Sequence, residues 1–151
     1  MESEKAMLHL SPLTRRITYV VIFETLAIIF ATLILTALAG GEAHNSFPVA
    51  VASSTIALIW NFIYNTGFER WERRAKITRR TPLLRAGHAL GFEGGLVLVL
   101  VPVYMWWYQI GPIDAVIMEA ALLVFFLVYT FIFTWIFDWI VPRTDLAPTT
   151  A

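Results

Sequence analysis

Residues 17–39, ITYVVIFETLAIIFATLILTALA, decide the fold, because they form one long apolar run whose single charged residue is Glu24. A helix that crosses a bilayer needs about 20 mostly apolar residues. Three more segments satisfy this requirement: one begins near Pro48 and runs past Asn65, and the others cover 86–108 and 113–140. We therefore expect an all-α membrane protein with four transmembrane helices.

The composition supports a membrane location. Of the 151 residues, 58% are hydrophobic and 15% are charged, and the net charge is zero. Soluble domains are about 45–50% apolar and about 25% charged. A net charge of zero argues against binding to nucleic acid. The chain has no cysteine, so thiolate metal sites are excluded, and we expect lipid as a partner and no cofactor.

All Lys and Arg residues lie on one side of the predicted spans. The short connections 40–47 and 109–112 contain none, and the eleven residues are Lys5, Arg15, Arg16, Arg70, Arg73, Arg74, Lys76, Arg79, Arg80, Arg85 and Arg143. Basic loops stay in the cytoplasm. The chain is thus expected in the bacterial inner membrane with both termini cytoplasmic. Its predicted parts are an N-terminal segment 1–16, a first transmembrane pair 17–69, a basic loop 70–85, a second pair 86–140 and a tail 141–151.

The chain repeats itself at a constant offset of 69 residues. The matching elements are Arg16, Phe23 and Glu24 with Arg85, Phe92 and Glu93, and segment 60–69 with segment 129–138. Each repeat has two spans, so both copies enter the membrane in the same direction, as in parallel-repeat transporters. We expect two tandem helix hairpins, each an antiparallel pair.

Glu24 is the most informative residue. It lies about 12 Å along the helix from Arg16, and an ionised carboxylate at that depth is costly, so such residues mostly have a function. We interpret it as a proton-binding group that exchanges a proton for a cation; the alternative is a protonated side chain that joins helices. Its repeat partner Glu93 is either structural or functional. Beside it, Gly87, Gly91 and Gly95 form a stripe for close helix contact, within the chain or between two copies.

The second span carries a polar face and an aromatic face. Asn61, Asn65 and Glu69 are spaced four residues apart and share a face. Trp60 and Tyr64 begin the adjacent aromatic stripe, which suits a hydrophobic cation or a packed helix interface. Because its helix should neighbour the first one, we expect Glu24 to meet Asn61 or Asn65. The candidate substrate-binding residues are Trp60, Asn61, Tyr64, Asn65, His88, Glu93 and Tyr129.

Other polar residues are assigned simpler roles. Arg16 with Glu69, and Arg85 with Asp138, fall at similar levels and are candidate ion pairs at the cytoplasmic rim. Glu119 lies near the outer end of the fourth span, where it could face water. No metal-ligand or nucleotide-binding motif is present, so we expect no enzymatic activity.

Four ordered motifs, beginning at Arg16, Trp60, Arg85 and Tyr129, resemble those of the proteobacterial antimicrobial compound efflux family. The resemblance implies two tandem bacterial transmembrane pair units. It also implies export of chlorhexidine and other amphipathic cations, or of short diamines, driven by the proton gradient, with Glu24 as the coupling carboxylate. The chain departs from the motifs at Tyr19, where His is usual, and at Thr134, where Asn is common.

The sequence thus predicts a proton-coupled exporter of hydrophobic cations that works as a homodimer, because four helices enclose little volume. One alternative is a non-transporting membrane protein in which Glu24 is a packing group. A passive cation channel is a further alternative, although no ring of acidic residues supports it.

Overall fold

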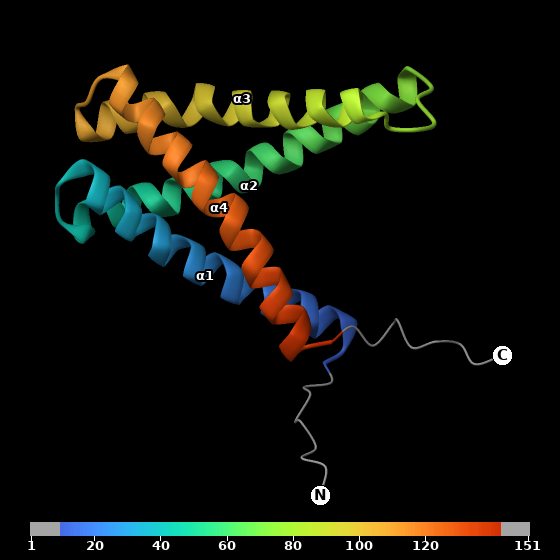
Figure 1. Ribbon diagram of the computed structural model, residues 1–151, viewed down its shortest axis with the longest axis horizontal. Coiled ribbons are helices and arrows are strands. Elements are labelled where there is room, and N and C mark those ends of the chain that lie inside the picture. Colours follow the sequence, from blue (N-terminus) through green and yellow to red (C-terminus); the bar gives the residue numbers. More distant parts are fainter. Residues whose placement is uncertain (1–9, 143–151) are drawn as a thin grey trace, which may run out of the picture. The chain divides into compact units, whose positions relative to one another are not determined.

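The computed structural model describes residues 10–142, in which there are four helices (Figure 1). They are α1 (Pro12–Ala39), α2 (Ala43–Arg74), α3 (Pro82–Tyr108) and α4 (Pro112–Ile140). All four are long and apolar enough to cross a membrane. The predicted fold class, an all-α membrane protein with four spanning helices, is confirmed. Residues 1–9 of the predicted N-terminal segment and residues 143–151 of the predicted tail, with Lys5 and Arg143, lie outside the described residues.

The helices begin before the apolar runs that predicted them. At the start of α1, the Ser11 hydroxyl accepts a hydrogen bond from the Thr14 backbone N–H (3.2 Å), and at the start of α3 the Thr81 hydroxyl does the same for Leu84 (3.3 Å). These are N-cap bonds, which satisfy free N–H groups of the first turn. The start of α2 at Ala43 places Pro48 inside the helix. A proline at this position lacks the N–H that would bond to the carbonyl of residue 44, so the helix has one hydrogen bond fewer there.

Left-handed residues end two of the helices. Gly40, with a φ of +69°, follows α1, and Gln109, with a φ of 53°, follows α3. This conformation terminates a helix and turns the chain at once. The connections between α1 and α2 and between α3 and α4 are therefore short.

The chain divides into two compact units, each described here by itself. The central unit (28–122) contains the end of α1, all of α2 and α3, and the start of α4. Its core includes Leu35, Val49 and Tyr104, all 2% exposed or less, and α2 and α3 lie side by side in it (Figure 1). The terminal unit, up to residue 27 and from residue 123, consists of the start of α1 and the end of α4. Each unit therefore contains helical segments from both sequence repeats.

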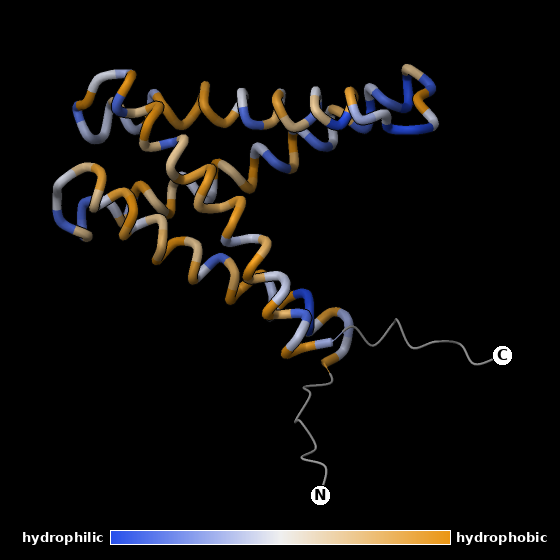
Figure 2. The backbone as a smooth tube through the Cα atoms, in the orientation of Figure 1, coloured by the Kyte–Doolittle hydropathy of each residue, from blue (hydrophilic) through white to orange (hydrophobic). Residues whose placement is uncertain are grey.

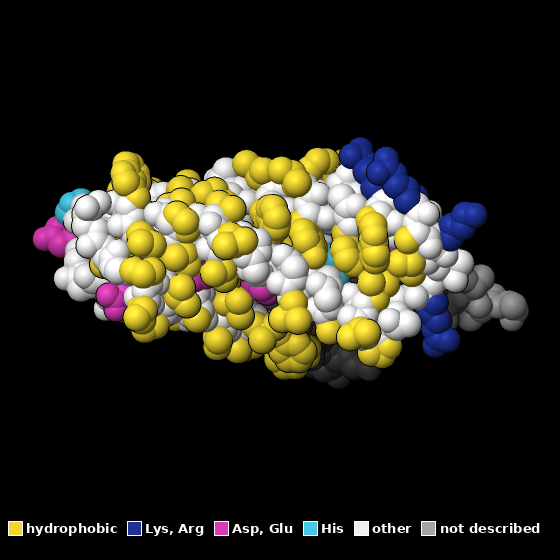
Figure 3. Space-filling view, turned by 90° about the horizontal axis from the view of Figure 1, so that it is seen from above, with side chains coloured by type: hydrophobic (Ala, Val, Ile, Leu, Met, Phe, Trp, Pro, Cys, Tyr) yellow, Lys and Arg dark blue, Asp and Glu magenta, His cyan; other side chains and the backbone are white. Residues whose placement is uncertain are grey.

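The surface of the helices is apolar. Hydrophobic residues run along all four helices, and the α2–α3 loop is hydrophilic (Figure 2). On the face drawn in Figure 3, hydrophobic side chains cover the middle, while Lys and Arg gather at one end. Leu98 is 77% exposed and Leu127 is 72% exposed. Exposed apolar surface on this scale is typical of helices that face lipid.

Candidate cation and proton site

One aromatic cluster forms where α2 packs against α3 in the central unit. The central cluster consists of Trp60, Tyr64, Phe68, His88 and Phe92, whose rings stack or meet edge to face. The Trp60 indole N–H donates to the Phe92 carbonyl (2.9 Å), and the Tyr64 hydroxyl donates to the His88 carbonyl (3.0 Å). Both bonds run from a side chain of α2 to the backbone of α3, so they fix the contact between the two helices.

Two glycines of α3 make this contact possible. A Cβ atom at Gly91 would collide with the Tyr64 hydroxyl, and one at Gly95 would collide with the Trp60 indole. A Cβ at Gly87 would meet open space. The glycine stripe, which the sequence left open as a contact within or between chains, is an intramolecular contact surface at these two positions.

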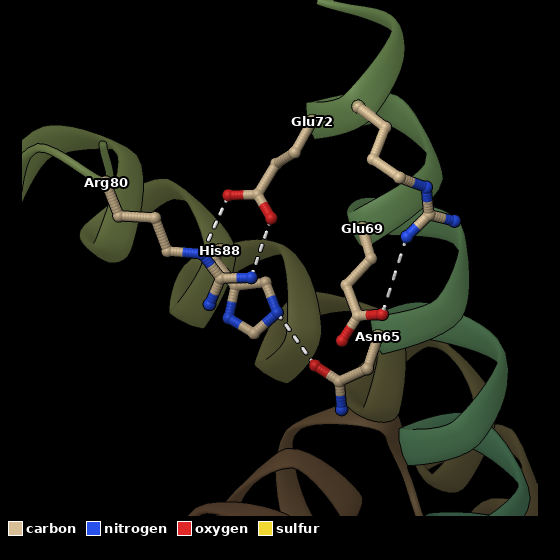
Figure 4. A network of polar contacts seen from close by, with 6 residues as sticks. Asn65, Glu69, Glu72, Arg80 and His88 are labelled. Carbon is tan, nitrogen blue, oxygen red and sulfur yellow. Dashed lines mark hydrogen bonds and ion pairs between the residues drawn. The ribbon is translucent and has the colours of Figure 1, made fainter. Parts of the chain in front are cut away.

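The polar face of α2 also meets α3 (Figure 4). The Asn65 amide donates to the Asn61 side-chain oxygen (2.7 Å), and its own oxygen is 2.9 Å from His88 Nε2. Towards the loop, Arg80 donates two 2.7 Å hydrogen bonds to the Glu72 carboxylate. This pair raises the pKa of Arg80 and joins the two sides of the α2–α3 loop.

A second aromatic cluster joins α1 to α4 in the terminal unit. The terminal cluster consists of Tyr19, Phe23, Tyr129, Phe133 and Phe137. The Tyr129 hydroxyl donates to the Phe23 carbonyl (2.9 Å). The hydroxyls of Tyr19 and Thr134 are 2.8 Å apart. Half-buried Glu24 follows Phe23 on α1, within electrostatic range of the Tyr129 hydroxyl.

The two clusters correspond member by member at the 69-residue offset. The equivalent pairs are Tyr19 and His88, Phe23 and Phe92, Trp60 and Tyr129, Tyr64 and Phe133, and Phe68 and Phe137. Their hydrogen bonds correspond as well. The bond from Trp60 to a helix carbonyl recurs as that from Tyr129, and the contact between His88 and Asn65 recurs as that between Tyr19 and Thr134.

This correspondence explains the two departures from the family motifs. Tyr19 and Thr134 stand where His and Asn are expected, and they are the two partners of one hydrogen bond. The central cluster retains the His–Asn form of the same pair, between His88 and Asn65. The contact has therefore kept its place in the fold while both partners changed.

The rim ion pairs differ from the prediction. Asp138, expected to pair with Arg85, forms its ion pair with Arg15 of the terminal unit, which also donates to the Val141 carbonyl (2.9 Å). Glu69, expected to pair with Arg16, lies 3.9 Å from Arg73 on the same helix. Two residues at the same depth in a membrane do not necessarily face each other, because each successive residue points about 100° further around its helix.

The structure distributes the predicted site residues over both units. Glu24 and Tyr129 belong to the terminal unit, and the central unit contains the others: Trp60, Asn61, Tyr64, Asn65, His88 and Glu93. The amides of α2, expected to meet Glu24, bond with one another and with His88 of α3. Among the described residues no three His, Asp or Glu side chains are grouped to hold a metal ion.

Sequence reasoning missed one acid of the central unit. Glu119, which we expected to face water, is 4% exposed, next to the fully buried Tyr104. The apolar residues around it in α4 left no sign of which side it faces, because that helix is hydrophobic on all sides.

Four helices that can span a membrane and a duplicated helix pair define a multi-pass membrane protein. Comparison with known proteins gives the family. A family model described as "BTP: Chlorhexidine efflux transporter" matches twice, over residues 11–74 and 80–143. The chain belongs to this family, and the two matches are offset by the same 69 residues as the internal repeat.

Curated relatives carry one description. A "Short-chain diamines transporter" of Vibrio parahaemolyticus is 35% identical over 114 residues, which cover 74% of this chain and 79% of the relative. A protein of the same description from Acinetobacter baumannii is 32% identical over 113 residues, 75% of this chain and 78% of the relative. One from Acinetobacter baylyi is 30% identical over 113 residues, 75% of this chain and 79% of the relative. No solved structure matches the chain.

Proposed function

We propose that this chain is a proton-coupled exporter of small organic cations, and that Glu24 is the group that binds either the proton or the cation. The observation that carries the proposal is a half-buried carboxyl within a membrane-spanning helix, beside an aromatic cluster. Acidic residues inside a membrane are costly and typically mark ion or proton pathways. Membership of an efflux transporter family supports the same conclusion.

Exchange of a proton for a cation requires a group that cannot bind both at the same time. A protonated Glu24 is neutral and stable in a dry site, whereas an ionised one needs a compensating charge. A substrate cation supplies that charge by Coulomb attraction. Cation and proton therefore exclude each other at Glu24, so release of the cation outside is coupled to uptake of a proton there.

The substrate class follows from the side chains near the carboxyls. Aromatic faces attract organic cations, and the attraction strengthens when the site excludes water. We infer that chlorhexidine-like amphipathic cations and short diamines are the substrates, in agreement with the descriptions of the family and the relatives. The proposed substrate-binding residues are Trp60, Asn61, Tyr64, Asn65, His88, Glu93 and Tyr129.

The proposal includes topology and assembly. The basic side chains at the α2–α3 loop favour a cytoplasmic loop in the inner membrane, which makes the segments 1–16 and 141–151 cytoplasmic and separates the transmembrane pairs 17–69 and 86–140. We infer a homodimer. Gly91 and Gly95 are covered within the chain, so the dimer contact uses another surface.

The test is transport by purified protein in liposomes, with chlorhexidine and putrescine as probes and an imposed pH gradient. Glu24→Gln mimics the protonated form permanently, so it should insert and fold but lose gradient-driven transport. Glu93→Gln is the matched variant at the repeat position: transport by it should still respond to the pH gradient, even where weaker cation binding lowers the rate. Wild-type transport rates in Glu24→Gln, or wild-type transport that ignores the gradient, would disprove the coupling role.

A further inference from the structure

Glu119 of α4 is a buried acid that the proposed exchange at Glu24 does not use. It is 4% exposed, and its Oε2 atom is the one fully buried side-chain polar atom of the described residues without a hydrogen-bond partner. Burial of an unsatisfied polar group is costly, and native proteins rarely retain one without a reason. The position of Glu119 therefore needs an explanation.

One hydroxyl group lies next to this acid, and others follow towards the α3–α4 turn. The nearest is that of Tyr104, which is fully buried and lies 3.2 Å from the Ser53 hydroxyl of α2. One turn further along α3, the Tyr108 hydroxyl donates to Ser46 of α2 (3.0 Å). Tyr108 lies within electrostatic range of Tyr104, so these two hydroxyl pairs lie between the end of α3 and a carboxyl about 10 Å inside α4.

No cation compensates an ionised Glu119 among the described residues that face it. The ionisable groups of α3 near it are Tyr104 and, within electrostatic range, Glu93, and Tyr108 lies within electrostatic range of Tyr104. Segments 28–39 of α1 and 45–57 of α2 contain no ionisable side chain. A second acid in range makes simultaneous ionisation of both carboxyls unfavourable.

The positions related by the repeat show that packing does not require polar groups here. The counterparts of Glu119, Tyr104 and Ser53 at the 69-residue offset are Ala50, Leu35 and Leu122. All three counterparts are buried in the same unit, at 4% exposure or less. One set of three equivalent positions is thus filled by polar side chains and the other by apolar ones.

We propose that Glu119 is a second proton-binding site, which exchanges protons with water at the α3–α4 turn through the hydroxyls of Tyr108 and Tyr104. The free Oε2 atom accepts the proton, and the carboxylate becomes a neutral carboxylic acid. A proton is the ligand that fits, because the acid is enclosed by protein and is not part of a metal-binding group of described residues. The inference extends the proposed transport function, because this site would supply protons from the side to which cations are exported.

Infrared difference spectroscopy of the full chain in liposomes tests this proposal, with pH as the perturbation. The background is Glu24→Gln, which removes the signal of that carboxyl. We expect one carboxyl C=O band that grows from mildly alkaline to mildly acidic pH and is lost in Glu119→Gln. Tyr104→Phe should keep this band and shift it to higher wavenumber, because the acid loses its hydroxyl neighbour.

Two outcomes would overturn the proposal. Difference spectra that are identical with and without Glu119→Gln mean that the residue does not titrate. A Glu119 band that is present in the absolute spectra at every pH, and therefore cancels in the difference spectra, means that the acid is permanently protonated and only structural. If Glu119→Gln fails to fold, the shift in Tyr104→Phe decides between the same alternatives. Because the readout is not transport, failure here leaves the test of Glu24 unaffected.

Discussion

Substitution of Gly95 by alanine tests how α2 is held against α3. The new methyl group would collide with the Trp60 indole, which is fixed by its 2.9 Å hydrogen bond to the Phe92 carbonyl. Moving the indole costs that bond, about 0.5–1.5 kcal/mol, and overpacking costs about 1–3 kcal/mol. We expect Gly95→Ala to lose about 2–4 kcal/mol of stability from the contact itself.

Gly94→Ala is the matched control, because a Cβ atom there meets nothing within 4 Å. Both variants gain the same helix preference of alanine over glycine, about 1 kcal/mol, so this gain cancels in their difference. The assay is reversible unfolding in mixed micelles. A difference of about 2–4 kcal/mol between the two variants is expected from the packing terms. Equal stabilities of Gly95→Ala and Gly94→Ala would refute the close packing of Trp60 against Gly95.

Three further predictions concern topology, substrate binding and the paired motif changes. Reporter proteins inserted within residues 73–80, or fused after the last helix, should be active in the cytoplasm, and a reporter that is active outside would contradict the assigned orientation. Trp60→Ala and Asn65→Ala should each weaken chlorhexidine binding about tenfold in calorimetric titrations; unchanged affinity in both would place the site elsewhere. Thr134→Val should lower the stability of the fold by about 1 kcal/mol. The double variant Tyr19→His with Thr134→Asn should be as stable as wild type, because the central cluster contains that pair. A double variant as unstable as Thr134→Val would argue against equivalent contacts in the two clusters.

The apolar runs and the repeat predicted the fold because membrane spans are limited by length and composition. They could not predict which helices share an interface. The short connection between α1 and α2 suggested that the side-chain amides of α2 contact α1, yet Asn65 forms a hydrogen bond with His88 of α3. Many side chains of a helix in lipid are apolar, so the pattern does not identify the packed side.

Single-residue choices escaped prediction for a related reason. The sequence paired Asp138 with Arg85 and Arg16 with Glu69, whereas Arg15, the neighbour of Arg16, is the residue that reaches Asp138. Two neighbouring residues of a helix point about 100° apart. Their predicted depths in the membrane are nearly the same, so depth does not show which of them faces a given partner. The aromatic stripe, by contrast, was predictable, since its four-residue spacing defines a helix face regardless of what that face meets.

The exchange of helices between repeats has a consequence for how such a chain assembles. Each aromatic cluster joins an odd-numbered helix of one repeat to an even-numbered helix of the other. A single helix pair on its own lacks half of every cluster, so it would have to find a second molecule to complete either one. In the fused chain the loop 75–81 holds the two halves at a high effective concentration, and completion of the clusters no longer depends on expression level. Fusion also frees the two clusters to diverge, since a change such as that at Tyr19 alters only one of them.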